Sequence, residues 1–311
     1  MDERTSKVIM TLDTNFLKRF ENNFSYDVNL SNYSWFNLGG NAEYFLKAKD
    51  KKQLIEFLRE AKKKNLKTTI LGAGSNILFR DNGVKGAVIK LANEFSYTKL
   101  VNENIIDVGA STLDRKVANF AKENNLGNLE FLSCIPGSVG GAIIMNSGCY
   151  EDDISKVLLS VQAIDKNNLS EIEIKRKDIK FSYRGTNLPE HLIIISAKLK
   201  GSISKKEEIE KKQSSLIERK KLTQPSQIKT CGSTFKNVSE EKKAWMLIKE
   251  AGCEDYREGD AMISQKHCNF FVNNGNAKSS DIENLIKKVK KKVHEKTGVN
   301  LELEIKIIGE K

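Results

Sequence analysis

Cysteine is scarce in this sequence and has no spacing that indicates a disulfide framework or a metal site. The 311 residues include five cysteines, an odd number, and no two of them form a Cys-x-x-Cys pair. This usage is typical of reduced thiols in a reducing compartment. Cys268 follows His267, but adjacent side chains of a strand point to opposite faces and cannot easily share one ion. We therefore expect unpaired, mostly buried cysteines and no metal.

Long apolar runs are also missing. No stretch is apolar enough to span a bilayer, and the opening MDERTSKVIMTLD lacks the hydrophobic core of a signal peptide. The composition, 39% hydrophobic and 30% charged, is that of a globular protein, and 311 residues exceed one ordinary core. We expect a cytoplasmic protein of two or three domains with no membrane partner.

Aromatic residues make up only 7% of the chain, which weighs against nucleic-acid binding despite a net charge of +11. In NLIKKVKKKVHEK the apolar Leu285, Ile286, Val289 and Val293 recur at helical spacing, so the lysines fall on a solvated helix face. The charge therefore indicates lysine-rich surfaces or an anionic small-molecule ligand. A basic nucleic-acid-binding protein stays an alternative, whose binding would fall steeply with salt.

Short β-rich runs alternate with helical patterns along the chain. Apolar runs predict strands at residues 42–48, 68–72, 86–91, 104–110, 141–146, 157–164, 169–175, 191–200, 267–273 and 301–308. Amphipathic spacing predicts helices at residues 51–65, 113–125, 205–221 and 242–251, with a further helix before the last strand. This order favours α+β domains over one doubly wound sheet.

Two glycine-rich segments, LGAGSN and IPGSVGGA, carry no basic side chain. The first follows a predicted strand, and its glycines let backbone N–H groups approach an anion. It is neither a P-loop nor a complete dinucleotide fingerprint, because the lysine and the third glycine are absent. In the second, Pro136 fixes one φ angle, and we expect Gly137, Gly140 and Gly141 to adopt conformations closed to other residues. Together the segments predict a pyrophosphate held by backbone N–H groups.

Six fragments occur in the order and approximate spacing found in UDP-N-acetylenolpyruvoylglucosamine reductases. They are GAGSN, IPGSVGGAIIMNSGCY, FSYRG, CGSTFKN, KHCNFFVN and GVNLELEIKIIG, and the resemblance covers about residues 35–309. It implies an α+β fold with a p-cresol methylhydroxylase-type FAD-binding domain of two α+β subdomains and a C-terminal α+β substrate domain. The implied parts are residues 1–92 and 93–202 for the FAD-binding subdomains, 203–300 for the substrate domain, and 301–311 for a closing strand.

The resemblance implies NADPH-dependent, FAD-mediated reduction of UDP-N-acetylglucosamine enolpyruvate to UDP-N-acetylmuramate for peptidoglycan, by a monomer. It implies that Arg184 and Glu304 act on the enolpyruvyl carboxylate and the enolic intermediate, and that Ser233 gives the proton. A guanidinium suits the first task because it is always charged and can bind a carboxylate through two hydrogen bonds. Lys221 and Asn237 match positions that hold the substrate. The expected non-covalent FAD contacts are Gly72, Ala73, Gly74, Ser75, Asn76, Ile135, Pro136, Gly137, Ser138, Gly140 and Gly141.

The chain departs from the family pattern at several positions. It has FKNV where the family usually has FKNP, and Gly185 and Thr186 where a serine often follows the tyrosine-arginine pair. The short EDYREGDAMIS leaves little room for the substrate loop of some members, so the chain resembles the loop-lacking class, and Tyr256 is not taken for the tyrosine of that loop. Another FAD-dependent oxidoreductase of the same fold and a catalytically inactive flavoprotein stay alternatives. Without the family, Arg184, Ser233 and Glu304 would be interpreted as surface or turn residues.

Overall fold

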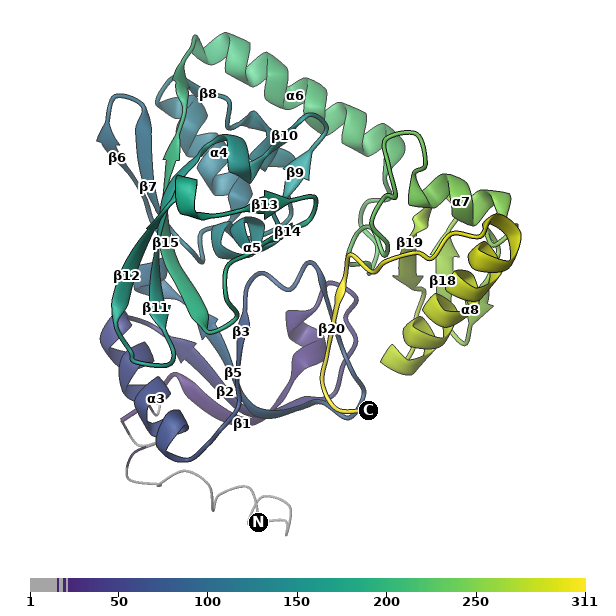
Figure 1. The fold of residues 1–311 in the computed structure, drawn as a ribbon, viewed down its shortest axis with the longest axis horizontal. Helices are drawn as coiled ribbons and strands as arrows, with labels where there is room; N and C mark the ends of the chain where they lie inside the picture. The colour runs from purple at the N-terminus through teal and green to yellow at the C-terminus, as the bar shows by residue number, and fades with distance from the viewer. Residues whose placement is uncertain (1–15, 17–18, 21) are drawn as a thin grey trace. The chain divides into compact units, whose positions relative to one another are not determined.

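The structure is a computed structural model that describes residue 16, residues 19–20 and residues 22–311 (Figure 1). The described chain divides into two compact units, each assembled from segments that lie far apart in the sequence. Unit 1 comprises the described part of residues 1–26 with residues 43–73 and 86–218, and unit 2 comprises residues 27–42, 74–85 and 219–311. The domain boundaries expected at residues 92, 202 and 300 stay predictions.

A four-stranded sheet in the order β1-β2-β5-β3 has its main part in unit 1. Its strands are β1 (Phe24–Asn29), β2 (Asn41–Ala48), β3 (Thr68–Leu71) and β5 (Val84–Leu91). Helix α3 (Lys51–Lys63) begins at Asp50, whose carboxylate accepts a hydrogen bond from the Gln53 N–H at 2.7 Å. Its apolar stripe is buried. The expected strands and helix of this part are confirmed, and β3 leads directly into Gly72.

A five-stranded antiparallel sheet in the order β12-β11-β15-β7-β6 forms the other part of unit 1 (Figure 1). Its strands are β6 (Thr98–Asn102), β7 (Ile105–Gly109), β11 (Leu158–Asp165), β12 (Glu171–Lys175) and β15 (Leu192–Lys200). Helix α4 (Asp114–Glu123) confirms the expected helix, and α5 (Val139–Ile144) contacts β7 and β15. Three short pairs complete the unit: β8 (Leu126–Gly127) with β16 (Ser202–Ile203), β9 (Gly148–Cys149) with β10 (Asp152–Asp153), and β13 (Phe181–Ser182) with β14 (Gly185–Thr186).

The strand expected at residues 141–146 is wrong, because this segment forms helix α5. A short apolar run has no period of its own that separates a strand from a buried helix. Here Val139, Ala142 and Ile143 are the buried residues, and their spacing is helical. The first turn of the helix is fixed to the segment after β7, since the N–H of Gly140 donates to the Ala110 carbonyl at 2.9 Å.

Unit 2 contains a three-stranded antiparallel sheet, two helices and one parallel strand pair (Figure 1). The elements are β17 (Arg257–Glu258), β18 (Ala261–Ser264), β19 (His267–Asn273), α7 (Ala244–Glu250), α8 (Ser279–Thr297), β4 (Ile77–Phe79) and β20 (Lys306–Ile308). Helix α8 buries Leu285, Ile286, Val289 and Val293 as expected. It ends at Gly298, whose φ of +72° suits a helix C-terminus.

The closing strand is shorter than the expected 301–308. Only residues 306–308 form a strand, β20, which runs parallel to β4. Residues 302 and 304 instead bond to the segment around Phe235, with the Lys236 N–H donating to the Glu302 carbonyl at 2.9 Å. Phe235 and Leu303 make a single bridge rather than a ladder. The segment whose apolar alternation predicted one strand therefore has two partners: its first part contacts the segment around Phe235, and its last part pairs with β4.

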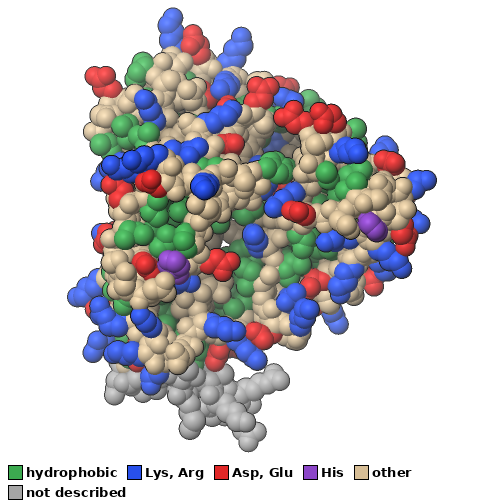
Figure 2. Space-filling model, viewed as in Figure 1, with side chains coloured by type: hydrophobic (Ala, Val, Ile, Leu, Met, Phe, Trp, Pro, Cys, Tyr) green, Lys and Arg blue, Asp and Glu red, His purple; other side chains and the backbone are tan. Residues whose placement is uncertain are grey.

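Helix α6 (Lys206–Thr223) has its first thirteen residues in unit 1 and its last five in unit 2. On the face shown in Figure 2, lysine and arginine side chains lie among acidic ones and form no continuous basic stripe. The alternative of a nucleic-acid-binding protein therefore gains no support from this face. Among the described helices, none is both long and apolar enough to cross a membrane. None of the five cysteines forms a disulfide in the described structure, and Cys134, Cys231 and Cys253 are buried.

Candidate active site

The loop from Gly74 to Asn76 in unit 2 turns its carbonyl groups inward. The Gly74 carbonyl accepts a hydrogen bond from the Trp35 N–H at 3.1 Å, and the Asn76 carbonyl accepts one from the Lys306 N–H at 2.9 Å. The N–H groups of residues 74–76 donate to no acceptor within the described part of the chain. Gly74 has φ +74°, and a Cβ there would lie 1.8 Å from the Tyr33 carbonyl oxygen. The loop thus has three consecutive N–H groups without an acceptor in the described structure, as loops that bind anions do.

The second glycine-rich segment, Ile135 to Gly141 in unit 1, leads into the first turn of α5. The N–H of Val139 donates to the Thr112 carbonyl at 3.0 Å, which fixes the segment beside residues 110–114. Among the described residues, no acceptor meets the N–H groups of Gly137, Ser138 and Gly141. The segment also approaches the first loop within unit 1, since a Cβ on Gly72 would lie 3.0 Å from Ser138 Oγ.

The expected conformation of these glycines is wrong, because Gly137, Gly140 and Gly141 all lie outside the left-handed region. Gly140 and Gly141 lie in the first turn of α5, and Gly137 precedes its N-cap Ser138. Lack of space for a side chain, rather than φ, explains the glycine at positions 137 and 140. A Cβ on Gly137 would lie 2.6 Å from Asp114 Oδ2, and one on Gly140 would lie 3.2 Å from Ala110 Cβ. At Gly141 the nearest atom would be 3.7 Å away, which is ordinary contact.

Asp114 lies behind Gly137 and is the buried residue that sequence reasoning missed. Its side chain is 0% exposed, and neither carboxylate oxygen has a hydrogen-bond partner within the described structure. Burial raises the pKa of this carboxyl well above its ordinary value. An acid at the first turn of a helix is ordinarily interpreted as a solvated residue, and no local pattern distinguishes this one.

These residues fit the pyrophosphate of FAD. Each segment, taken by itself, offers N–H donors without acceptors, so a phosphate group can approach its backbone closely. The segment of residues 74–76 lies in unit 2, and residues 72–73 and 135–141 lie in unit 1.

Arg184 lies in unit 1, in the two-residue turn between β13 and β14. Ser182 pairs with Gly185 across the turn, and Arg184 itself has φ +57°, a costly conformation for a residue other than glycine. The hairpin is attached to the second residue after α5, because the Asn146 amide donates to the Ser182 carbonyl at 3.1 Å. The guanidinium carbon lies 5.0 Å from the centre of the Tyr183 ring. The half-buried Arg184 is therefore held in a strained turn.

Ser233 and Glu304 come together in unit 2. Ser233 is half-buried and pairs with Phe270 of β19. The N–H of Glu304 donates to the carbonyl of Thr234, the residue after Ser233, at 2.9 Å. The Asn76 amide donates to the Glu304 carbonyl at 3.0 Å. Unit 2 therefore holds the backbone of Glu304 between Asn76 and Thr234, the residue after Ser233.

Cys231 reinforces the same arrangement from two residues before Ser233. Its thiol donates to the Ile77 carbonyl at 3.3 Å, and Ser34 Oγ donates to the same carbonyl at 2.6 Å. Burial is the largest cause that raises the pKa of Cys231 to about 11, so this group stays a thiol at neutral pH. Its role in the structure is that of a packed hydrogen-bond donor.

The two expected substrate residues also lie in unit 2. The side-chain oxygen of Asn237 accepts a hydrogen bond from the Ala244 N–H at 3.0 Å, which fixes Asn237 at the start of α7. Lys221 lies in the last turn of α6 with an exposed side chain, and its carbonyl accepts a hydrogen bond from the Lys266 side chain. Asn237 thus has a defined position, whereas the position of the Lys221 side chain has less support.

His267, considered from the sequence only beside Cys268, lies in an aromatic cluster. Its ring centre is 4.8 Å from that of Phe270 and 6.3 Å from that of Trp245. Its Nδ1 accepts a hydrogen bond from the Asn269 N–H at 3.2 Å, and burial lowers the pKa of the imidazole. Within the described residues, no group of three or more His, Cys, Asp or Glu side chains could hold a metal ion.

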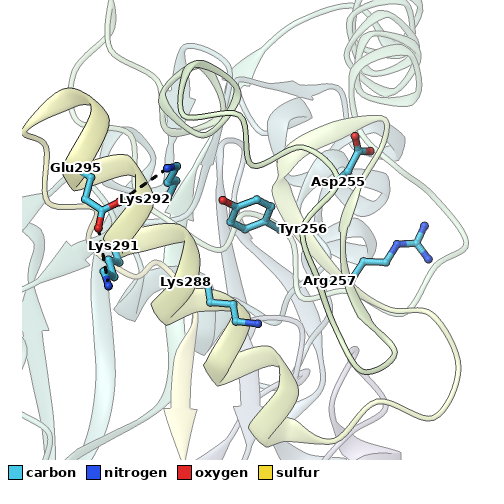
Figure 3. A pocket seen from close by; sticks show the side chains of 7 residues that line it. All are labelled: Asp255, Tyr256, Arg257, Lys288, Lys291, Lys292 and Glu295. Atoms are coloured by element: carbon cyan, nitrogen blue, oxygen red, sulfur yellow. Dashed lines mark ion pairs between the residues drawn. The ribbon is translucent and has the colours of Figure 1, made fainter.

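A hollow of about 500 Å³ lies elsewhere in unit 2, between α8 and the residues before β18 (Figure 3). Three of its cations lie near acids: Glu295 lies 3.9 Å from Lys291 and 4.0 Å from Lys292, and Lys288 pairs with Glu258. Tyr256 lies in its wall, as Figure 3 shows. The hollow holds none of the expected site residues, and its mixed charge is that of a solvated surface.

Comparisons with known proteins agree with this arrangement. Residues 42–168 match the model of an FAD binding domain, and residues 224–308 match the C-terminal domain of UDP-N-acetylenolpyruvoylglucosamine reductase. The reductase of Pelagibacter ubique is 45% identical over 92% of this chain and 94% of its own. The reductase of Orientia tsutsugamushi (strain Ikeda) is 43% identical over 95% of this chain and 97% of its own.

A solved structure shows the same fold. The crystal structure of the reductase from Thermus caldophilus superposes with a TM-score of 0.79 at 31% identity, covering 92% of this chain and 98% of that one. The expected α+β architecture, with an FAD-binding domain before a C-terminal domain, is confirmed. On these likenesses the chain belongs to the UDP-N-acetylenolpyruvoylglucosamine reductase family.

Proposed function

We propose that this protein reduces the enolpyruvyl group of UDP-N-acetylglucosamine enolpyruvate to give UDP-N-acetylmuramate, with NADPH as hydride donor and non-covalently bound FAD. The observation that carries the proposal is that the backbone of Glu304 is bonded both to Asn76, in the N–H-rich loop, and to Thr234, the residue after Ser233. Family membership supplies the substrate class. We further propose a cytoplasmic, monomeric enzyme of the loop-lacking class.

The chemistry requires charge stabilisation followed by protonation. Bound FAD supplies the two-electron carrier between NADPH and the substrate. Hydride addition at the terminal enolpyruvyl carbon leaves negative charge on the neighbouring carbon, beside the carboxylate. In our proposal Arg184 binds that carboxylate, because a guanidinium keeps its charge and can donate two parallel hydrogen bonds. Its strained turn holds the side chain before substrate arrives, which lowers the cost of orienting it.

Ser233 gives the proton in our proposal. A serine hydroxyl is a weak acid in water, but the carbanion or enolate that it protonates is a far stronger base, and fixed geometry dominates such a step. The bridge to Phe270 and the preceding Cys231 contacts hold its backbone in place. Glu304, whose N–H donates to the carbonyl of Thr234, joins Arg184 in stabilising the enolic form. Asn237 and Lys221 bind the diphosphate and sugar of the substrate.

The test uses purified protein reconstituted with FAD. It should be yellow, release its flavin on acid precipitation, and consume NADPH when the enolpyruvyl sugar nucleotide is added. Mass spectrometry should show a product heavier than the substrate by two hydrogen atoms. Protein that stays colourless with excess FAD contradicts flavin binding. Flavin that is reduced by NADPH but never reoxidised by this substrate indicates another FAD-dependent oxidoreductase.

A further inference from the structure

Asn76 contacts the closing segment through both its side chain and its backbone. Its amide donates to the Glu304 carbonyl at 3.0 Å, while its own carbonyl accepts from the Lys306 N–H at 2.9 Å. The next residue, Ile77, begins the parallel pairing of β4 with β20. Asn76 is therefore the point at which the glycine loop is joined to the segment that carries Glu304.

Both backbone polar groups of Glu304 are bonded. The N–H donates to the Thr234 carbonyl at 2.9 Å, and the carbonyl accepts from the Asn76 amide at 3.0 Å. This peptide lies in the stretch between the Phe235 bridge and β20, where no regular ladder holds the chain. The Asn76 side chain thus replaces a missing ladder bond, and a half-buried carbonyl that lost it would be left without this donor.

The N–H groups of the same loop are the donors that an anion would need. The N–H groups of residues 74–76 have no acceptor in the described chain, whereas the Gly74 carbonyl is bonded to Trp35. A phosphate bound by those N–H groups restrains Asn76 directly, because one of the three N–H groups is its own. The residue whose N–H would bind the anion is therefore also the residue whose side chain bonds the Glu304 carbonyl.

We infer that Asn76 is a positioning residue that couples occupancy of the residue 74–76 loop to the placement of Glu304. The inference rests on the proposed function, in which Glu304 acts on the substrate. Asn76 acts through the backbone of Glu304 and not on the reacting atoms. Its loss should therefore disturb the half-reaction that needs Glu304 and leave the other half-reaction unchanged.

The experiment measures the two half-reactions of FAD-saturated holoenzyme by stopped flow. Asn76→Ala should be reduced by NADPH at the wild-type rate, while reoxidation by the enolpyruvyl substrate slows roughly 10- to 100-fold, the effect of a small displacement of a reacting group. Asn76→Asp, which keeps the size and loses the donor, should slow reoxidation at least as much. Asn82→Ala is the matched control, because the Asn82 amide donates to the Lys311 carbonyl at 2.8 Å away from the loop. It should behave as wild type.

A double-mutant cycle separates this inference from the proposed function. If Asn76 acts through Glu304, then Asn76→Ala combined with Glu304→Ala should be no slower in reoxidation than Glu304→Ala alone. If the double variant is slowed by the product of the two single effects, the inference is wrong. The inference is also wrong if Asn76→Ala is reoxidised at the wild-type rate, whatever FAD affinity fluorescence titration gives for this variant. Wild-type reoxidation by Glu304→Ala overturns the proposed role of Glu304 itself. Melting temperatures near that of wild type show that each variant is folded.

Discussion

At the scale of single residues, a buried carboxyl group without a partner destabilises the fold that contains it. Asp114 is such a group, with 0% exposure and two unbonded oxygens among the described atoms. Ionising it inside unit 1 would be costly, so the protonated form is favoured and the pKa is raised. Its position behind Gly137 places this cost directly under the glycine-rich segment.

Asp114→Asn should remove a pH dependence from folding. Because the folded-state pKa is raised, the wild-type protein gains stability at low pH and loses it as the pH rises from the ordinary value near 4 through the folded pKa. Within that window the free energy of unfolding of wild type should fall relative to Asp114→Asn by up to about 1.4 kcal/mol per pH unit. Urea melts from pH 4 to pH 8 measure it. Parallel curves for the two proteins would show that Asp114 does not titrate in this window.

Ser233→Ala should separate protonation from hydride transfer. A general acid contributes about 10²- to 10⁴-fold, so reoxidation by the enolpyruvyl substrate should slow by that factor, or about 3 to 5 kcal/mol. Reduction by NADPH should stay near wild type, because the proton is needed only afterwards. Ser233→Cys should keep part of the activity, since a thiol can donate from nearly the same place. Equal slowing of both half-reactions in stopped flow would remove Ser233 from the role of acid.

At the scale of elements, the start of α5 contains one glycine that packing requires and an adjacent glycine that packing does not require. The two adjacent glycines differ in their surroundings: a Cβ on Gly140 would approach Ala110 to 3.2 Å, and one on Gly141 would find only ordinary contact at 3.7 Å. Neither has a positive φ, so the argument from backbone strain does not apply to them. What a side chain at each position disturbs should therefore differ.

Gly140→Val should destabilise the protein without cofactor, by about 1 to 3 kcal/mol, because the added side chain would crowd Ala110. Gly141→Val should leave that stability nearly unchanged but weaken FAD binding, because its bulk obstructs the N–H groups where the pyrophosphate would bind. Thermal melts of flavin-free protein and fluorescence titration with FAD measure the two effects. If Gly141→Val binds FAD as wild type does, this part of α5 does not contact the cofactor.

The elements that could be predicted are those whose pattern is complete within one segment. Helix α8 shows its buried residues at helical spacing, and β11, β15 and β19 lie within two residues of their expected limits. Helix α5 could not be distinguished from a strand, because six residues carry less than two helical turns of pattern. The split of residues 301–308 depends on two distant partners, Phe235 and β4, which no local window contains.

At the scale of the whole molecule, the family motifs indicate the residues of the candidate site, but only the fold shows which of these residues contact one another. Asn76 was predicted as a cofactor contact, and its bond to Glu304 joins residues 228 positions apart. Asp114 was not predicted, because burial depends on how β7, α4 and α5 are packed. The composition weighs against whole classes of protein, such as nucleic-acid-binding proteins, but it does not indicate contacts between individual residues. The roles that the motifs indicate therefore stay predictions, and the structure adds the long-range contacts that hold these residues in place.

The pairing of β4 with β20 has a consequence for how the protein is made. A ribosome synthesises residues 74–79 long before residues 304–308, and β4 has its described partner only in β20. A nascent chain that has emerged through α8 still lacks the donor from Lys306 and the carbonyl of Glu304 that hold Asn76. Such distant pairing pays its loop-closure entropy late, so it forms slowly. We therefore expect the loop of residues 74–76 to reach its final conformation only after the chain has been translated past Ile308.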